Sequence, residues 1–523
     1  MQSVQGSDAI PAPSSLPSSK SVFIKWGLLG SVGLINGYAT ILMYSRGELA
    51  FALLTVILTA LALYIFGSKK TYAHRYIYPG IAGMILFILF PLAYTVGLAF
   101  TNYSAKNQLS LERTQTVLLD RSFQSGESYP FTLYKTDNGH QIVVKDGDQL
   151  LATDVFSLEG MTATEMDLSA IESVQGEKEK IKAIIQNRSA ISGVDFHLPD
   201  GDDIRMSGLR KFAAVAPLYT LQGDGETLIN NESGEVLKPN MEVGFYQPVD
   251  EKGEFIGNTI SPGFVVDIGT ANFERVWKDD GIKEPFISIF IWTVVFSICT
   301  VVFTLAIGLI LANIVQWEEL KGRSIYRVLL ILPYAVPAFI SILIFKGLFN
   351  QSFGEINMVL ESIFGLSPNW FSDPILAKTM VLIVNTWLGF PYMMILCMGL
   401  LKAIPEDLYE ASAIDGANFI DNFKRITFPL MIKPLTPLLI AAFAFNFNNF
   451  VMIQLLTNGG PNMIGTSEPA GYTDLLVSYT YRIAFEGGGG QDFGLASAIA
   501  TLIFLLVGAL ALLNLRFTKL TQD

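Results

Sequence analysis

Cysteine and histidine, the residue types most often used for metal binding and nucleophilic chemistry, are poorly placed for either role in this chain. Cys299 and Cys397 both lie within long apolar runs and have no Cys-x-x-Cys neighbour, so we expect neither a disulfide framework nor a zinc site. His140 and His197 lie in a polar region without a second ligand at metal-binding spacing, and we expect them to be solvated loop residues. The sequence therefore predicts no catalytic residue and no metal site.

The segment 408–429 is better suited to recognition of another protein than to catalysis. It reads Leu408-Tyr-Glu-Ala-Ser-Ala-Ile-Asp-Gly-Ala and continues to Arg425-Ile-Thr-Phe-Pro429. Acidic residues favour the first turn of a helix, and proline suits the first helical position. We therefore expect a short amphipathic helix, a turn at Gly416, a second short helix, and a longer helix that begins near Pro429. Such a compact surface element could dock into a cleft on a partner.

The composition indicates a membrane protein with one water-soluble insertion. The chain has 523 residues, of which 51% are apolar and 16% are charged, whereas average soluble domains carry about 25% charged residues. Residues 101–284 contain 17 Lys and Arg against 30 Asp and Glu, which is a net charge of −13, and the remainder of the chain is +1. These values disfavour an ordinary soluble enzyme and exclude a disordered or collagen-like chain.

Eight apolar stretches are long enough to cross a bilayer, which needs about 20 residues per helix. They are residues 24–44, 49–67, 77–100, 285–315, 325–348, 375–400, 429–456 and 493–515. We therefore predict a polytopic α-helical membrane protein with eight transmembrane helices. The first stretch is expected to be a retained anchor, because no small-x-small cleavage pattern follows it and a second stretch comes directly after.

The positive charges of the short loops predict the orientation in the membrane. In an eight-span layout most of them fall on one side, which is then cytoplasmic, whereas the opposite side holds only Arg46, Lys378 near a helix end and a few others besides the 101–284 insertion. The charges on the cytoplasmic side are Lys69, Lys70, Arg75, Lys321, Arg323, Arg327, Lys402, Lys424, Arg425, Arg516 and Lys519. The predicted organisation is a cytoplasmic tail (1–23), helices one to three (24–100), a periplasmic domain (101–284), helices four to eight (285–515, with the loop 402–428), and a cytoplasmic tail (516–523).

The acidic insertion has the pattern of a β-rich (α+β) domain. Residues 141–144 and 149–152 flank Asp146-Gly147 and predict a β-hairpin, and frequent Glu and Lys predict a helix over residues 163–187. We expect this domain to bind a soluble partner. A purely structural cap is the alternative.

Two other features of the spans bear on function. No Asp or Glu stands in the middle of a predicted helix, which counts against an ion-coupled secondary transporter. A membrane-tethered sensor would need a cytoplasmic output domain, whereas the longest predicted cytoplasmic stretch is only the loop 402–428. Pro333 and Pro337 predict a kink in the fifth stretch, which could bend during gating or be static.

The segment 408–429 also carries a family resemblance. It resembles the coupling loop of permease subunits of bacterial ABC importers, and the matching positions are Glu410, Ala411, Gly416, Ile426 and Pro429. The sequence departs from the family pattern at Ser412, where the family has Ala, and at Phe428, where it has Leu. Two later stretches, Asn446-Phe-Asn-Asn-Phe450 and Leu456-Thr-Asn-Gly-Gly-Pro461, are similar to the maltose/maltodextrin permeases, which also have eight spans and a large periplasmic domain after the third.

The resemblance implies a set of partners. In the family the coupling loop, here including Ser412, docks into a groove of an ATPase subunit. This chain has no G-x-x-x-x-G-K-[ST] phosphate-binding loop, so it cannot itself be the ATPase. The resemblance implies a separate ATPase homodimer that binds ATP and Mg²⁺, and no cofactor is expected in this chain. The other implied partners are a second permease subunit, a periplasmic maltose-binding protein, the sugar and the lipid bilayer. No nucleic acid is expected.

The resemblance also implies a sugar site on two helices. The implied positions are Asn385, Leu388, Gly389, Tyr392, Phe445, Asn446 and Asn449. Amides can donate to and accept from sugar hydroxyls, aromatic rings can cover the C–H face of a sugar, and glycine permits close approach. Ala442 stands where the maltose permeases carry Ser. Membrane asparagines can instead bond helices to one another, and this alternative stays open.

The sequence thus predicts a transport subunit rather than an enzyme. It would form part of the translocation path of an ATP-driven maltose/maltodextrin importer and work by alternating access. A permease for a different oligosaccharide is the main alternative, and a secondary sugar transporter is a weaker one.

Overall fold

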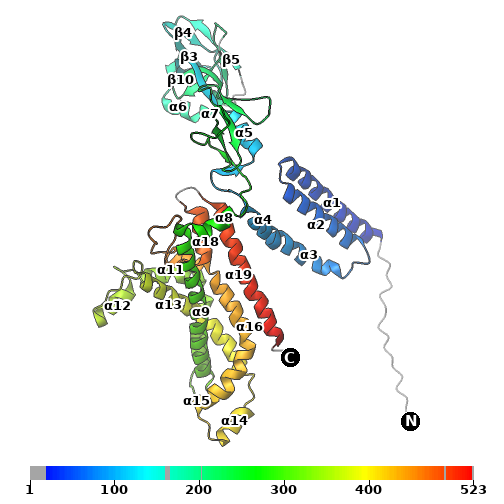
Figure 1. Ribbon diagram of the computed structural model, residues 1–523, viewed down its shortest axis with the longest axis vertical. Coiled ribbons are helices and arrows are strands. Elements are labelled where there is room, and N and C mark those ends of the chain that lie inside the picture. Colours follow the sequence, from blue (N-terminus) through cyan, green and yellow to red (C-terminus); the bar gives the residue numbers. More distant parts are fainter. Residues whose placement is uncertain (1–18, 159–164, 202, 488–490, 521–523) are drawn as a thin grey trace. The chain divides into compact units, whose positions relative to one another are not determined.

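The computed structural model describes residues 19–158, 165–201, 203–487 and 491–520 and divides into two compact units, Met1–Gly97 and Leu98–Asp523. The described part of the first unit is helical (Figure 1). Its elements are α1 (Ser19–Ser45), α2 (Leu49–Gly67), α3 (His74–Met84), the π-helical turn η1 (Ile85–Leu89) and α4 (Phe90–Leu98). The Nδ2 of Asn36 donates to the Oγ1 of Thr59 at 3.0 Å, so α1 and α2 are bonded to each other.

A β-rich domain begins the second unit, as the sequence predicts. One sheet has the order β5-β8-β9-β10-β2-β3-β4-β6, with β7 paired to β2. Its strands are β2 (Ser122–Thr136), β3 (Gly139–Asp146), β4 (Gln149–Ala152), β5 (Glu165–Asp167), β6 (Ser169–Ile171), β7 (Glu177–Lys178), β8 (Asp195–His197), β9 (Asp203–Gly208) and β10 (Lys211–Pro217). The rings of Phe131 and Phe196 stack on Phe212 at 4.2 and 4.6 Å, which places a stacked aromatic core on this sheet.

A smaller lobe completes the domain. It is the meander β11 (Tyr219–Leu221), β12 (Leu228–Asn230), β13 (Val236–Asn240) and β14 (Phe245–Pro248), with α5 (Leu111–Leu119) and the parallel pair β1 (Asn107–Leu109) and β15 (Gly263–Phe264). Asn102 joins the two ends of the domain: its Nδ2 donates to the carbonyl of Phe264, and its Oδ1 accepts from the amide of Val266.

The predicted hairpin is confirmed, and the predicted helix over 163–187 is wrong. Strands β3 and β4 pair through Asp146 and Gln149. Helix is limited to α6 (Ile181–Gln186) and α7 (Arg188–Ile191), and part of the stretch forms short strands; residues 163 and 164 lie outside the described residues. Gly176 interrupts a helix here because its φ is +97° and an added Cβ would lie 2.3 Å from the carbonyl oxygen of Lys135.

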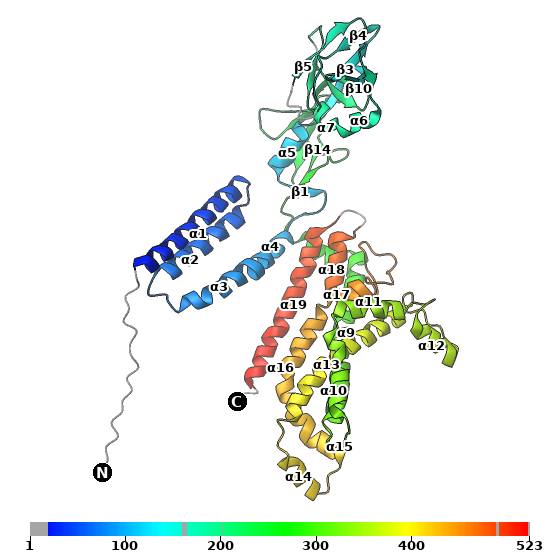
Figure 2. The ribbon, with the colours of Figure 1, turned by 180° about the vertical axis from the view of Figure 1, so that it is seen from behind.

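The helices of the second unit follow the β-rich domain. They are α8 (Ala271–Lys278), α9 (Asp280–Gln316), α10 (Arg323–Ala335), α11 (Ala338–Leu348), α12 (Glu355–Phe364), α13 (Pro374–Leu401), α14 (Asp407–Ile414), α15 (Phe419–Asn422), the π-helical turn η2 (Phe423–Thr427), α16 (Phe428–Phe447), α17 (Phe450–Leu456), α18 (Leu476–Phe485) and α19 (Phe493–Leu520). In both views α14 and α15 lie at the end of the helical bundle opposite to α8 and α18 (Figures 1 and 2).

The number of membrane-spanning helices differs from the eight predicted. Among the described residues, six helices are long and apolar enough to cross a bilayer, or seven if α10 and α11 count as one bent span. The apolar segment Phe493–Ala509 within α19 is shorter. The count of eight therefore stays a prediction. The bend between α10 and α11 is 91°, and it confirms the predicted kink: Val336, which precedes Pro337, is extended as residues before proline tend to be.

Helices α9 and α13 approach closely at two glycines. A Cβ on Gly308 of α9 would lie 2.7 Å from the backbone nitrogen of Met394, and a Cβ on Gly389 of α13 would lie 2.8 Å from the Cγ2 of Thr304. Small residues allow this close approach, which is the usual basis of helix association in membranes.

We predict that Gly308→Ala destabilises the protein by about 1–3 kcal/mol, because the new methyl group meets backbone atoms that cannot rotate away. Thermal unfolding of the detergent-purified chain measures this. Gly399→Ala on α13 is the control, since an added Cβ there meets no atom within 4 Å and its melting temperature should be unchanged or higher. Equal melting temperatures for the two variants would contradict the close contact.

Candidate functional site

Three asparagines predicted to bind sugar come together where α9, α13 and α16 meet. The Nδ2 of Asn385 donates to the Oδ1 of Asn446 at 2.8 Å, and its Oδ1 accepts from the Nδ2 of Asn449 at 3.2 Å. Asn385 and Asn446 are 6% and 8% exposed, so the amides are almost completely removed from solvent. We call these three residues the amide cluster.

The chain breaks its helix at the amide cluster. Helix α16 ends at Phe447, and α17 begins at Phe450 with Asn449 as its N-cap, whose Oδ1 accepts from the amide of Met452. The Nδ2 of Asn446 donates back to the carbonyl of Ala442, so the backbone of Ala442 takes part in the cluster although its side chain has no hydroxyl. The predicted seventh span, residues 429–456, is thus two helices joined at asparagines.

Sequence reasoning missed a hydroxyl of α9 in this cluster. The Nδ2 of Asn385 also donates to the Oγ1 of Thr300 at 3.1 Å. The sequence pattern could have indicated it, because hydroxyl residues recur at intervals of four, three and four residues along one face of α9. They are Thr293, Ser297, Thr300 and Thr304. A helical face of small polar side chains within an apolar run marks a helix–helix contact.

The other predicted sugar-site residues lie outside the amide cluster's hydrogen bonds. Gly389 packs on Thr304, and Leu388 packs against the apolar cluster that includes Val384 and Ile453. The ring of Tyr392 stacks on Tyr334 of α10 with a centroid distance of 6.5 Å, and it is 40% exposed.

The side chain of Phe445 is 72% exposed and therefore stands free of the cluster in this chain. The structure brings the three amides together and leaves both predicted aromatic residues at least partly accessible. The amides bond to one another and to α9, which is the arrangement that the helix-bonding alternative requires.

A buried ion pair fixes the segment between α17 and α18. The Nη1 of Arg482 lies 2.9 Å from the Oδ2 of Asp474, and the two side chains are 7% and 0% exposed. Asp474 also accepts from the amide of Gly471 and the hydroxyl of Ser478. The other terminal nitrogen of Arg482 donates to Asn462 and thereby holds the far side of the loop.

The segment predicted as a coupling loop forms the two short helices that the sequence indicates. Helix α14 ends before Gly416, whose φ is +79°, and α15 begins with Asn418 as its cap. The hydroxyls of Tyr409 and Thr427 are bonded at 2.9 Å, and the Oγ of Ser412 donates to the Oδ1 of Asn422 at 2.7 Å. The first bond joins α14 to η2 and the second joins α14 to α15, so the three segments form one rigid element.

The surface of this element is partly apolar. Glu410 and Ala411 are exposed, and Ile414, Phe419 and Ile420 are 88%, 72% and 59% exposed. Ile426 is half-buried against Met431 and other core residues, and Pro429 follows it in the first turn of α16. Exposed apolar side chains held on a firm element are characteristic of a docking surface. Figure 2 shows the element at the end of the helical bundle.

The histidines of the β-rich domain pair with carboxylates, and they lie in strands rather than loops. The Nδ1 of His197 in β8 lies 2.5 Å from the Oδ1 of Asp203, and this hydrogen bond raises the pKa of His197. His140 in β3 lies 3.8 Å from a carboxylate oxygen of Glu179. Among the described residues no group of three or more His, Cys, Asp or Glu side chains could hold a metal ion.

Comparisons with known proteins match nearly the whole chain. A family model described as the maltose transport system permease protein MalF P2 domain matches residues 109–269, and one for the MalF N-terminal transmembrane helices matches residues 23–70. A third, the inner membrane component of binding-protein-dependent transport systems, matches residues 304–519.

Relatives similar over their full length carry one name, maltose/maltodextrin transport system permease protein MalF. The protein of Vibrio vulnificus strain YJ016 is 83% identical over 100% of both chains, and that of Vibrio cholerae is 78% identical, also over 100% of both. The protein of Escherichia coli strain K12 is 60% identical over 96% of this chain and 97% of its own.

We predict that Asp474→Ala destabilises the protein by about 3–5 kcal/mol, because it leaves Arg482 buried without its main counter-ion. Thermal unfolding of the purified chain measures the loss. Glu486→Ala is a matched control: Glu486 pairs with the same arginine at 3.1 Å but is 33% exposed, so its removal should cost at most about 1 kcal/mol. Similar losses for both variants would contradict the role of burial.

Proposed function

The chain belongs to the MalF family of maltose/maltodextrin transport permeases, and from this premise we propose how its parts divide the work of transport. As a family member it is a membrane permease subunit of a maltose/maltodextrin ABC importer, and ATP hydrolysis lies in a separate subunit. Full-length identity of 60–83% to named permeases carries this assignment.

We propose that the amide cluster is the part of the translocation path that binds sugar. Sugar hydroxyls offer the same donors and acceptors as amides, so they can replace the bonds that Asn385 makes with Asn446 and Asn449 without leaving a buried polar group unpaired. The amides would then bond to one another when sugar is absent and to sugar when it is present.

The remaining predicted residues would surround the sugar ring. Tyr392 and Phe445 present accessible aromatic faces, which suit the C–H face of a sugar, while Leu388 and Gly389 would shape the wall. Alternating access follows if the amide cluster opens to one side of the membrane at a time, and the helix break at Asn449 gives α16 and α17 a point at which to bend.

We propose that the element formed by α14 and α15 is the contact with the ATPase. Ile414, Phe419 and Ile420 supply an apolar surface, and its two helices are shaped by Glu410, Ala411, Ser412, Gly416, Ile426 and Pro429. The bonds between Ser412 and Asn422 and between Tyr409 and Thr427 make it rigid, so a movement of the ATPase would be passed to α16 rather than absorbed.

We further propose the complete assembly and its orientation. The partners are a second, MalG-like permease subunit, a MalK-like ATPase homodimer that binds ATP and Mg²⁺, and a periplasmic maltose-binding protein that docks on the β-rich domain. Both termini and the coupling loop would face the cytoplasm of the bacterial inner membrane, and residues 101–284 would be periplasmic. The distribution of Lys and Arg among the short loops supports this orientation.

We predict that Asn385→Ala and Asn449→Ala each lower maltose uptake about threefold to tenfold, the equivalent of one or two lost hydrogen bonds. Uptake into proteoliposomes containing the whole transporter measures this. Asn448→Ala is the control, because Asn448 is exposed and bonds only weakly to Ala444 within its own helix. Unchanged uptake in both test variants would refute the sugar site, and uptake of another oligosaccharide in preference to maltose would refute the substrate.

We predict that Phe419→Glu abolishes co-purification with the ATPase, since it places a charge in the proposed apolar contact. Affinity purification of the tagged permease followed by quantification of the ATPase tests this. Phe353→Glu changes a phenylalanine that is 84% exposed in the loop between α11 and α12, and it should leave assembly intact. Normal ATPase recovery with Phe419→Glu would contradict the proposed contact.

A further inference from the structure

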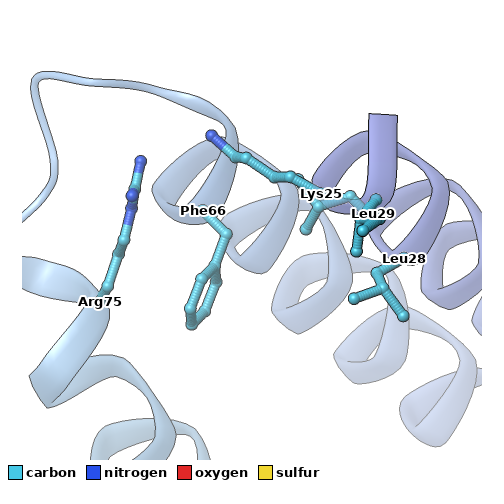
Figure 3. Close-up of a pocket in the computed structure, with 6 residues that line it drawn as sticks. Lys25, Leu28, Leu29, Phe66 and Arg75 are labelled. Atoms are coloured by element: carbon cyan, nitrogen blue, oxygen red, sulfur yellow. The ribbon is translucent and has the colours of Figure 1, made fainter. Parts of the chain in front are cut away.

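A cavity in the first unit lies between α1, α2 and α3. Its volume is about 460 Å³, and it is lined by Ile24, Lys25, Leu28, Leu29, Phe66 and Arg75. Figure 3 shows that the charged ends of Lys25 and Arg75 converge on one side of the cavity, while Phe66, Leu28 and Leu29 form its apolar part. A ligand that fills it would need an anionic end and an apolar end.

The two cations are held in place by the end of α2. The Nζ of Lys25 donates to the carbonyl of Gly67 at 3.1 Å. Arg75 donates through Nε to Ile65 and through Nη2 to Ser68, at 3.2 and 2.6 Å. These bonds use one of three ammonium donors and two of five guanidinium donors, so both side chains keep N–H groups for a ligand.

The positive charge at this end of the unit is not neutralised by residues 19–97. Residues 19–97 contain Lys20, Lys25, Lys69, Lys70 and Arg75 near the beginning of α1, the end of α2 and the beginning of α3. The only acidic residue in this stretch is Glu48, which precedes the opposite end of α2 and is therefore about 28 Å away along the helix. An anionic ligand in the cavity would meet Lys25 and Arg75 and no nearby carboxylate of residues 19–97.

Exposed aromatic residues lie beside Lys25 and Arg75 in the sequence. Trp26, Tyr72 and Tyr76 are 57%, 59% and 75% exposed, Lys25 lies 5.5 Å from the Trp26 ring, and Arg75 lies 5.3 Å from that of Tyr72. Trp and Tyr gather at the headgroup level of bilayers. These aromatic residues therefore favour a position of the cavity at the level of the lipid phosphate groups.

We propose that this cavity binds an anionic glycerophospholipid, with the phosphate on Lys25 and Arg75 and the first part of an acyl chain against Phe66, Leu28 and Leu29. Basic residues near a leaflet surface attract anionic lipids, and the predicted orientation places this end in the cytoplasmic leaflet, where such lipids concentrate. The site goes beyond the sugar path and the ATPase contact, and its test needs neither sugar nor ATP.

The test is retention of phosphatidylglycerol by the purified full-length chain. The chain is delipidated, incubated with phosphatidylcholine vesicles with or without phosphatidylglycerol, and repurified, and bound lipid is quantified by mass spectrometry. The double variant Lys25→Gln, Arg75→Gln should retain about tenfold less phosphatidylglycerol than the parent. The matched control Lys69→Gln, Lys70→Gln loses the same charge from exposed residues outside the cavity and should retain nearly as much as the parent.

Further arms separate the proposal from a purely structural role of the two cations. If they only stabilise the end of α2, the double variant will melt lower than the parent by the same amount with and without phosphatidylglycerol, which would overturn the proposal. A melting-temperature difference between the double variant and the parent that is larger with phosphatidylglycerol than without it supports the proposal. The conservative variant Lys25→Arg, Arg75→Lys should keep the lipid. Equal lipid retention by all variants, or equal stabilisation by soluble glycerol phosphate, would refute a lipid site.

Discussion

The close contact between α9 and α13 is the constraint on which the helical part of the second unit depends. Gly308 and Gly389 allow the two backbones to approach, and that approach places Thr300 within 3.1 Å of Asn385. Asn385 in turn orients the asparagines at the break between α16 and α17. In an apolar surrounding each of these polar groups needs a partner, so the spacing of one helix pair determines where the neighbouring helices can sit.

Much of this arrangement could be predicted from sequence because its signals are local. The lengths of the apolar stretches predicted most of the helices, and Asp146-Gly147 predicted the hairpin. Gly416 predicted the turn between α14 and α15, where its φ of +79° favours glycine. The amides of Asn385 and Asn449 were singled out by family resemblance, and their helices do bring them into contact. Residue type and family pattern together were sufficient to select three asparagines that lie together in the structure.

The missed features depend on contacts between distant residues. The strands between residues 165 and 178 look helical by composition, and they become strands only because a sheet supplies partners such as Asp195–His197. The bond of Thr300 to Asn385 spans 85 residues, and the burial of Asp474 with Arg482 depends on the fold of a loop rather than on a periodic pattern. Composition could not show either, since Thr, Asp and Arg are usually solvated at a surface.

The residues at the two ends of the β-rich domain lie side by side. The backbone at Thr101 pairs with Asp267, Asn102 bonds to both Phe264 and Val266, and Asn272 donates to the carbonyls of Ala99 and Thr101. The chain therefore enters and leaves this domain through one narrow base. Loops within the domain can change in length without displacing the residues at that base.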